Sequence, residues 1–319
     1  MKHLVVGPGA MAYFMFLGTL SAFSDKGALN DLETISGSSA GALLGFLFIL
    51  TKGDVSRVFE ESVQIPVQKI MKPNIKTLLT SYGLVKSKKI LGILKTITLK
   101  FCTSETLTFA ELYTHWPIKF YVSACCVDLV TTHYFSVDTH PSMSVHDALS
   151  MTIAIPFLFQ SVKHDRWHYI DGGLLEETPC GAIISEHPES VHVIRLTYQN
   201  TTAQIQSLRA YGFQVMTLAM TLRHKYRMFP ETAVDEGGYD IFDFTDSFDT
   251  KVKMFVKGYT SCTIFPLRVE NDHPQTPVEE QMQCQEHPEQ TCDAADDPSQ
   301  TTQDPQDEPM HHLHEDTFP

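Results

Sequence analysis

The feature that most constrains the fold is a unit of strand, glycine-rich turn and helix that occurs twice near the start of the chain. The apolar run His3–Val6 stops at Gly-Pro-Gly and is followed by helix-favouring residues over Ala10–Phe23. A second short strand is predicted at Asp31–Ile35, and the sequence GSSAG then leads into the apolar helix Ala40–Leu50. This alternation predicts an α/β fold in which the two strands belong to a parallel sheet.

The pattern continues along the chain, although less regularly. Buried strands are predicted at Ile118–Leu129, Thr132–His140, Trp167–Gly173 and Ser190–Tyr198. Helices are predicted to begin at Thr108, to begin at His146 and end near Pro156, and to span about residues 205–230. No internal repeat is visible, so these elements form a single α/β arrangement.

The acidic net charge belongs to the end of the chain. The formal net charge is −14, but 14 of the 38 acidic residues follow Arg268, the last basic residue, and the other 24 balance the 24 Lys and Arg. Residues 270–319 are rich in Gln, Pro, Asp, Glu, Thr and His and poor in aliphatic residues, so we expect a disordered acidic tail. The cluster His311, His312 and His314 could hold a metal, and a solvated cluster is the other interpretation.

Cysteine usage and hydropathy bear on the compartment. The seven cysteines form no CxxC pair, which indicates neither a disulfide framework nor a zinc site and mildly favours a reduced, intracellular compartment. No apolar run is long enough to span a bilayer. The opening stretch looks like a signal peptide, but Gly-Pro-Gly interrupts its apolar region, so we expect it to be retained. The expected location is intracellular, either cytoplasmic or peripheral at a membrane.

Residues 62–104 have a basic character of their own, with eight lysines and no acid. One interpretation is a basic amphipathic surface that contacts anionic lipid. The other is an ordinary pair of surface helices with a solvated basic face. The lysines are Lys69, Lys72, Lys76, Lys86, Lys88, Lys89, Lys95 and Lys100.

GSSAG matches the pattern G-x-S-x-G, in which a serine lies on a sharp turn between a strand and a helix. Gly37 and Gly41 would let neighbouring backbone come close, and the helix N-terminus would lie beside Ser39. Ser39 is therefore a candidate nucleophile, with a plain turn as the alternative.

A base for this serine is suggested by Asp171-Gly172-Gly173, which ends an apolar strand. The late histidines of the folded part, His187, His192 and His224, do not lie in a turn typical of the histidine loop of a Ser-His-Asp triad. A Ser–Asp dyad is therefore the better hypothesis. Partial burial would raise the pKa of Asp171 from about 3.9 toward the working pH. A simple Asp-Gly turn is the alternative.

Donors for an oxyanion are expected in the loop Gly7–Ala10, which follows the first strand. If both early strands are parallel neighbours, this loop and Ser39 emerge at the same edge of the sheet. Amides of Gly9 and Ala10 would then face the serine, whereas Pro8 has no N–H.

Five motifs in this order resemble the patatin-like phospholipases: GPGAMAYFMFLGTL, ISGSSAGAL, TFAEL, HDALSMTIAIPFLF and YIDGGLLEETP. The resemblance covers about residues 1–200. It implies a three-layer α/β/α sandwich with a mostly parallel central sheet. It also implies acyl-ester hydrolysis of lipids without a metal or other cofactor, with Ser39 as nucleophile, Asp171 as base, and Gly7, Gly9 and Ala10 as the oxyanion loop.

The resemblance leads to a division into a catalytic domain at 1–200, a helical extension at 201–269 and the acidic tail at 270–319. The expected substrate is a phospholipid or another lipid ester at a membrane surface, and no nucleic-acid partner is expected. Pro8 interrupts the family's glycines, and Met11 stands where a basic residue is usual. The alternative function is therefore a catalytically weak protein of the same fold that binds membranes or a partner.

Overall fold

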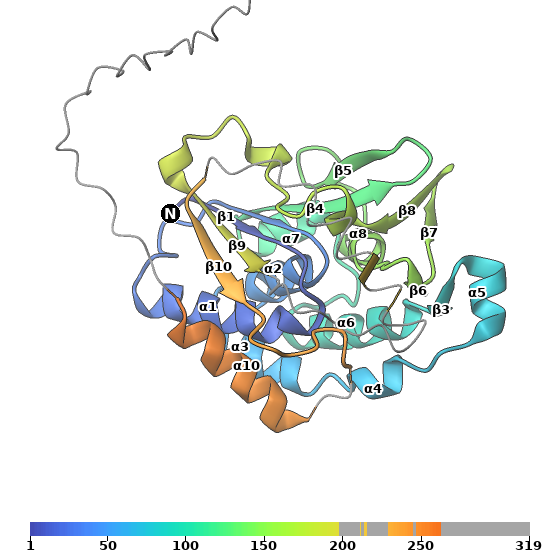
Figure 1. Ribbon diagram of the computed structural model, residues 1–319. Coiled ribbons are helices and arrows are strands. Elements are labelled where there is room, and N and C mark those ends of the chain that lie inside the picture. The colour runs from blue at the N-terminus through green and yellow to red at the C-terminus, as the bar shows by residue number, and fades with distance from the viewer. Residues whose placement is uncertain (198–210, 212–213, 216–228, 245–246, 263–319) are drawn as a thin grey trace, which may run out of the picture. The chain divides into compact units, whose positions relative to one another are not determined.

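The two early strands lie side by side at the centre of a mixed sheet in the computed structural model (Figure 1). The structure describes residues 1–197, 211, 214–215, 229–244 and 247–262. The sheet order is β10 (Glu231–Asp235), β9 (Val191–Thr197), β1 (His3–Val6), β2 (Thr34–Gly37), β4 (Lys119–Cys126), β8 (Trp167–Asp171) and β7 (Val162–His164), with β5 (Thr131–Phe135) paired to β4.

The strands from β10 to β4 are mutually parallel, whereas β5, β8 and β7 are antiparallel to their neighbours. The expected α/β class with a mostly parallel central sheet is therefore confirmed. Every residue of β1 and β2 is buried, as is typical of parallel strands covered on both faces.

Helices supply most of the remaining structure. They are α1 (Tyr13–Asp25), α2 (Ala40–Leu50), α3 (Val55–Val63), α4 (Val67–Ile70), α5 (Ile75–Ser81), α6 (Lys88–Phe101), α7 (Phe109–His115), α8 (Val145–Thr152) and α10 (Phe248–Thr260). Short 3₁₀ turns are η1 (Ala10–Ala12), η2 (Gly172–Leu174), η3 (Gly181–Ile183) and η4 (Pro188–Ser190). A small second sheet joins β3 (Gly83–Val85) to β6 (Phe157–Phe159).

The larger hydrophobic core lies between one face of the sheet and helices that include α1, α2, α7 and α8. Side chains of opposite orientation on β1 and β9, such as Val5 and Val193, join a smaller cluster with Ile183 of η3 and Phe229 on the other face. Both faces of the sheet are therefore covered in the described part of the chain, one by α-helices and the other by a segment that includes η3. Helix α2 is buried almost all round, which explains why its sequence carries no polar face.

Helices α1 and α10 pack closely because each places a glycine at the contact (Figure 1). A Cβ added at Gly18 would lie 2.0 Å from the Phe255 carbonyl oxygen, and one at Gly258 would lie 1.8 Å from that of Met15. The Thr19 hydroxyl donates to the Gly258 carbonyl at 3.2 Å across the same contact. Helix α10 is thereby fixed to the face of the sheet that carries the larger core.

Two boundaries differ from the prediction. Strand β2 begins at Thr34, later than expected, and continues through the small residues Ser36 and Gly37. Helix α8 ends at Thr152 rather than near Pro156, and the chain after it turns into β6. Ser36 and Gly37 are weak strand formers by themselves and are held in β2 by pairing with β1 and β4. The Ala154 carbonyl accepts a hydrogen bond from the Asp171 N–H at 3.0 Å, so the chain has already left the helix before Pro156.

The part of the chain after β9 is described only in pieces. Within 201–269 the structure contains strand β10 as well as helix α10, so this segment is not purely helical. Most of the helix predicted at 205–230 and all of the tail predicted at 270–319 lie outside the described residues, so both stay predictions. In the part that the structure does describe, no helix is long and apolar enough to cross a bilayer.

Candidate active site

The nucleophile elbow and the glycine loop lie next to each other because β1 and β2 are paired in register, with Val6 opposite Gly37. Ser39 has φ 52° and ψ −119°, a strained conformation that directs its side chain away from the turn. A Cβ at Gly41 would lie 2.2 Å from the Val6 carbonyl oxygen, and one at Gly37 would lie 2.6 Å from the Ala42 Cα. Both elbow positions therefore require glycine.

Hydrogen bonds hold the backbone of the elbow in place. The Ser39 N–H donates to the Thr152 hydroxyl at the end of α8, at 2.8 Å. The Gly41 N–H donates to the Ser38 carbonyl at 2.9 Å. The N–H of Ala40 donates to no acceptor among the residues that the structure describes, and it lies at the positive end of α2. Thr152 and Ala40 are functional candidates that the sequence reasoning did not single out.

Strand β4 brings the aspartate to the serine. Val122 of β4 pairs with both β2 and β5, and Ala124 pairs with both β5 and β8, so β2 and β8 share one edge of β4. They run toward each other along that edge and end at Gly37, opposite Val122, and at Asp171, opposite Ala124. The ends of two strands that are far apart in sequence are thus two residues apart on a third strand.

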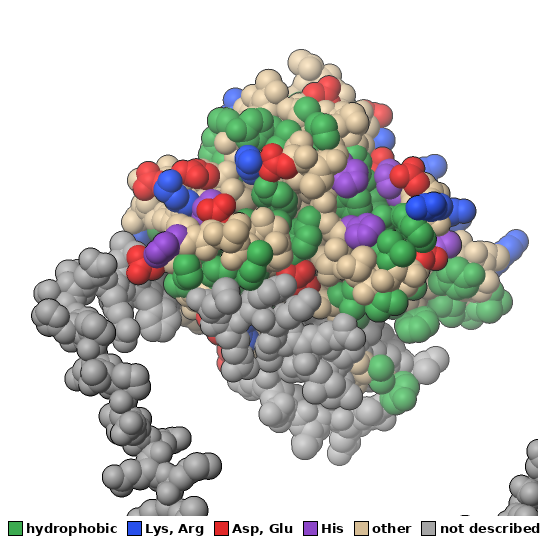
Figure 2. All heavy atoms as spheres, turned by 90° about the horizontal axis from the view of Figure 1, so that it is seen from above, with side chains coloured by type: hydrophobic (Ala, Val, Ile, Leu, Met, Phe, Trp, Pro, Cys, Tyr) green, Lys and Arg blue, Asp and Glu red, His purple; other side chains and the backbone are tan. Residues whose placement is uncertain are grey.

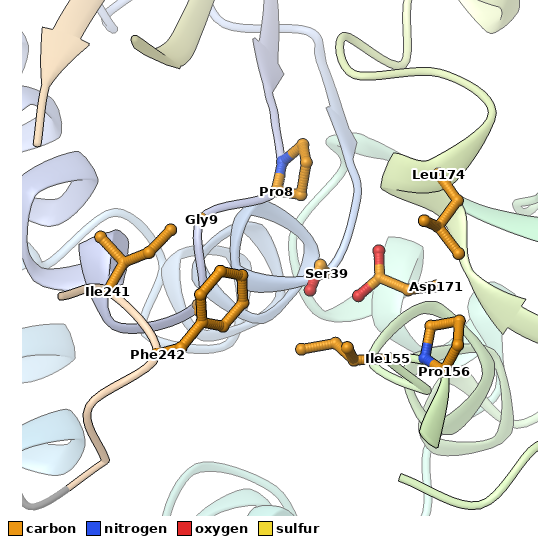
Figure 3. Close-up of a pocket in the computed structure, with 10 residues that line it drawn as sticks. Pro8, Gly9, Ser39, Ile155, Pro156, Asp171, Leu174, Ile241 and Phe242 are labelled. Atoms are coloured by element: carbon orange, nitrogen blue, oxygen red, sulfur yellow. The ribbon is translucent and has the colours of Figure 1, made fainter. Parts of the chain in front are cut away.

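The Ser39 hydroxyl and the Asp171 carboxylate point toward each other in the pocket (Figure 3). Asp171 is 5% exposed. Burial raises its pKa to about 6, against the smaller opposing effects of hydrogen bonds from the Ser39 hydroxyl and the Gly173 N–H. The Gly173 N–H donates to Asp171 Oδ1 at 2.9 Å, and the Asp171 N–H donates to the Ala154 carbonyl at 3.0 Å. The carboxylate is therefore oriented by its backbone surroundings, and its pKa is suited to a base near neutral pH.

The Asp-Gly-Gly turn is packed against β4 and against the glycine loop. A Cβ at Gly172 would lie 2.4 Å from the Ser123 carbonyl oxygen, so only glycine fits there. A Cβ at Gly173 would lie 2.5 Å from Pro8 Cγ. Pro8, which interrupts the glycines of the loop, therefore packs directly over the turn that holds Asp171.

The glycine loop offers fewer donors than the sequence suggested. The Gly7 N–H donates to the Ile194 carbonyl of β9 at 2.9 Å, so the expectation that Gly7 is an oxyanion donor is wrong. Gly7 is needed for packing, because a Cβ there would lie 2.7 Å from the Glu177 carbonyl oxygen. The N–H groups of Gly9 and Ala10 donate to no acceptor within the described part of the chain, and Ala10 has φ 46°. These two amides remain the loop's candidates for an oxyanion.

The sequence model of the family described as Patatin-like phospholipase matches residues 4–184, which is more than half of the chain. The chain belongs to the patatin-like phospholipase family.

The chain is also similar to one viral protein and to two solved bacterial structures. Probable lipid hydrolase 463L of Invertebrate iridescent virus 6 is 26% identical over 191 residues, which cover 58% of this patatin-like chain and 64% of the viral protein. The match thus spans less than two thirds of that relative. The crystal structure of VipD from Legionella pneumophila gives a TM-score of 0.50 at 14% identity, over 82% of this chain and 65% of VipD, and shows a shared fold. ExoU from Pseudomonas aeruginosa gives a TM-score of 0.45 at 11% identity, over 82% of this chain and 52% of ExoU.

The pocket at Ser39 and Asp171 has a volume of about 380 Å³, which includes space open to solvent. Besides Ser39 and Asp171, it is lined by Pro8, Gly9, Ala10, Ile155, Pro156, Leu174, Ile241 and Phe242 (Figure 3). No histidine is among these described lining residues. Ile241 also accepts a hydrogen bond from the Met11 N–H at 3.0 Å, so the segment after β10 closes one side of the glycine loop. Sequence patterns gave no signal for that contact.

A second, larger cavity of about 870 Å³, part of it open to solvent, adjoins the pocket, and the two share Ala10, Ser39 and Ile155 as lining residues. Its other lining residues are Met11, Tyr13, Phe14, Ala40, Leu43, Leu47, Ser62, Ile65, Val67, Ile70, Met71, Ile90, Ile93, Leu94, Ile153, Phe159 and Phe244. Apart from the hydroxyls of Ser39, Tyr13 and Ser62, every side chain in the lining is apolar. Tyr13 and Ser62 are 2.6 Å apart and bond each other, so the wall offers little to a polar ligand.

The described residues contain no group of three or more His, Cys, Asp or Glu side chains suited to a metal ion. The histidines of the tail lie outside the described residues.

Proposed function

We propose that this patatin-like protein is a lipid acyl hydrolase of the phospholipase A or lysophospholipase type. The observation that carries the proposal is the position of Ser39, which bonds the buried Asp171 and lines both the catalytic pocket and the apolar cavity. Such a serine can meet an ester carbonyl whose acyl chain enters the apolar cavity while its alcohol part occupies the smaller pocket.

The first half of the reaction is acyl transfer to the serine. Asp171 accepts the Ser39 proton as Ser39 Oγ attacks the ester carbonyl carbon. The negative charge on the carbonyl oxygen is stabilised by the amides of Gly9 and Ala10 and by the Ala40 N–H at the start of α2. The C–O bond to the alcohol then breaks, and the leaving oxygen takes the proton back from Asp171.

The second half returns the enzyme to its starting state. A water molecule gives a proton to Asp171 and attacks the acyl-serine carbonyl, with the same amides facing the oxyanion. Collapse of this intermediate breaks the bond to Ser39 Oγ, which recovers its proton from Asp171 and releases a fatty acid. A base with a pKa of about 6 is largely unprotonated at neutral pH and can serve in both halves.

Contact with a membrane surface through the basic segment 62–104 is part of the proposal. Two of its lysines meet carboxylates: Lys100 bonds Glu61 at 2.6 Å, and Lys95 lies 3.9 Å from Glu105. The remaining six are exposed and form no ion pair with any residue in the described ranges: Lys69, Lys72, Lys76, Lys86, Lys88 and Lys89. Unpaired lysines contribute about 1 kcal/mol each to attraction by an anionic lipid surface.

The test measures hydrolysis of phosphatidylcholine and of a p-nitrophenyl ester, with products identified by mass spectrometry. Ser39→Ala and Asp171→Asn should each abolish turnover. Ser38→Ala is the matched control, because the buried Ser38 hydroxyl has no hydrogen-bond partner among the described residues and its loss should leave activity intact. Activity that survives in both dyad variants would refute the mechanism.

The alternative function, a catalytically weak protein that binds membranes or a partner, gains support from the loop. The Gly7 amide is already bonded to β9, and Pro8 cannot donate, so two of the loop's positions offer no donor. Loss of one oxyanion donor costs about 3 kcal/mol in known hydrolases. Labelling with a fluorophosphonate probe distinguishes the two functions: a folded protein whose Ser39 never reacts favours binding without catalysis.

A further inference from the structure

Four large apolar side chains project into solvent from one corner of the molecule, formed by α5, β3 and β6. Ile75 and Leu79, one turn apart on α5, are 72% and 78% exposed. Tyr82, which follows α5, and Phe157, which begins β6, are 68% and 67% exposed. We call these four residues the apolar tip. None of them belongs to a hydrophobic cluster of the described residues.

The elements of the tip are joined through the small sheet, because β3 and β6 pair in parallel with Gly83 opposite Phe157. Tyr82 therefore precedes the residue that is paired with Phe157, which brings the two aromatics to the same end of this sheet. Figure 1 places α5, β3 and β6 together at the right-hand edge. Figure 2, turned about the horizontal axis, shows hydrophobic side chains at the surface on that same side.

Both aromatics occupy a backbone conformation that is unfavourable for them. Tyr82 has φ 61° and Phe157 has φ 64°, in the left-handed region that glycine or asparagine adopts far more readily. Burial does not compensate for this strain, since both side chains are mostly in solvent. Strained residues of this kind are concentrated where a protein meets a ligand or partner.

The tip is close in sequence and structure to the residues that would receive the lipid. Phe157 directly follows Ile155 and Pro156, which line the catalytic pocket. Two residues further along β6, Phe159 lines the apolar cavity. Beneath the tip, Ile70 and Phe159 form a small core with Val85, and the first two also line that cavity.

The charge around the tip selects its partner. Lys72 and Lys76 lie beside Ile75, and Lys86 and Lys88 follow β3; all four are exposed and meet no carboxylate within the described part of the chain. Apolar and aromatic side chains flanked by lysines fit the boundary between headgroups and acyl chains of an anionic bilayer. A second protein of acidic character would match the charge but would not require strained aromatics in solvent.

We propose that the apolar tip inserts into the surface of an anionic lipid bilayer and holds the entrance of the acyl cavity against it. The proposal rests on the proposed lipid hydrolase function, which it extends from the reaction to the way that the substrate is reached. An acyl chain could then pass from the bilayer to the cavity next to inserted apolar side chains rather than through water.

The test uses the full chain carrying Ser39→Ala, so that the vesicles are not consumed. Its affinity for vesicles of phosphatidylcholine containing about a third phosphatidylserine is measured by co-sedimentation. Tyr82→Asn/Phe157→Asn should lower that affinity by about tenfold or more, because two inserting rings are lost. Val256→Asn/Tyr259→Asn is the matched control: it removes two exposed apolar side chains from α10, which Figure 1 places away from the tip, and it should bind as the parent does.

Two further readouts separate insertion from a structural role. Asparagine relieves the left-handed strain, so Tyr82→Asn/Phe157→Asn should melt at or above the temperature of the parent. A Phe157→Trp variant should be quenched by brominated lipid, whereas Tyr259→Trp should not. Unchanged vesicle binding, a clearly lowered melting temperature or an absence of quenching overturns the proposal. So does a dimer in solution that the tip substitutions dissociate, because the tip would then be an interface between copies.

A second assay distinguishes failure of this proposal from failure of the proposed hydrolase function. It measures hydrolysis of a soluble short-chain ester by the chain that retains Ser39. The tip residues line neither cavity, so in the chain that retains Ser39 the double variant Tyr82→Asn/Phe157→Asn should hydrolyse that ester at the wild-type rate. Hydrolysis without tip-dependent vesicle binding refutes the tip alone. Tip-dependent binding by a protein that hydrolyses nothing supports the tip and refutes the hydrolase.

Discussion

Replacing Asp171 by asparagine should make the protein more stable while it abolishes hydrolysis. Burial raises the pKa of this carboxyl from 3.8 to about 6, which means that the folded state disfavours the charged form. At 1.36 kcal/mol per pKa unit, the difference destabilises the folded protein by about 3 kcal/mol at neutral pH. Loss of the acceptor for the Ser39 hydroxyl offsets about 1 kcal/mol of the gain, leaving a net stabilisation of about 2 kcal/mol.

The destabilisation by the Asp171 carboxyl depends on pH. Below the unfolded pKa of 3.8 the carboxyl is protonated in both states, so it costs nothing. As the pH rises toward about 6, the unfolded state loses its proton first and unfolding is favoured; above that pH the cost is constant. The stability gained by Asp171→Asn should therefore grow by about 2 kcal/mol between roughly pH 4.5 and pH 8.

Urea denaturation of the wild type and the variant at both pH values measures this change. Asp138→Asn is a control of opposite sign, because hydrogen bonds from Tyr121 and Lys119 hold the pKa of the Asp138 carboxyl below its usual range. That variant should lose stability at high pH and recover it as the pH falls. A stability difference for Asp171→Asn that is the same at both pH values, or a less stable variant at pH of about 8, would refute the reasoning.

Three further results are expected. With kcat/KM measured against pH, hydrolysis should rise with an apparent pKa of about 6 and level off above it, since Asp171 must be ionised to accept a proton; a flat profile contradicts its role as base. Gly173→Ala should lower kcat at least about tenfold, because the added Cβ would collide with Pro8. Adding Pro8→Gly to that variant should restore part of the lost kcat, and no recovery would mean that the contact with Pro8 is not the cause. Thr152→Val leaves the Ser39 N–H without its acceptor and should cost about 1–3 kcal/mol of stability by urea denaturation, whereas Thr152→Ser should not; equal losses in both would assign the effect to packing.

The sequence predicted correctly those elements whose ends are marked by nearby residues. His3–Val6 and Ala40–Leu50 have the predicted bounds, because each is a continuous apolar run that ends at glycine or begins at the elbow. Strand β2 is shifted toward the C-terminus relative to the prediction. Its last two residues, Ser36 and Gly37, are not typical strand formers, and they belong to the strand because β1 and β4 pair with them on both sides.

The candidate site shows the same division between local and distant causes. Ser39 and Asp171 were predicted from their own motifs, and the structure places their side chains together. The Gly7 N–H is bonded to a carbonyl of β9, and one wall of the pocket is formed by Ile241 in the segment after β10. No sequence pattern around the glycine loop predicts either contact. The hydrogen bond from Ser39 to Thr152 was missed for the same reason.

The shared edge of β4 has a consequence for how such a protein can diversify. The spacing of Ser39 and Asp171 is fixed by two strands that end on one partner, and neither end depends on the length of the connections between them. Much of the larger, apolar cavity, by contrast, is lined by α4, α6 and the end of α3, which lie within one segment of the chain between α2 and β4. On the proposed function, exchange of that segment would change which acyl chains are accepted while the reacting groups stay in place. Acyl selectivity and reactivity would then be carried largely by separate stretches of the chain and could be inherited independently.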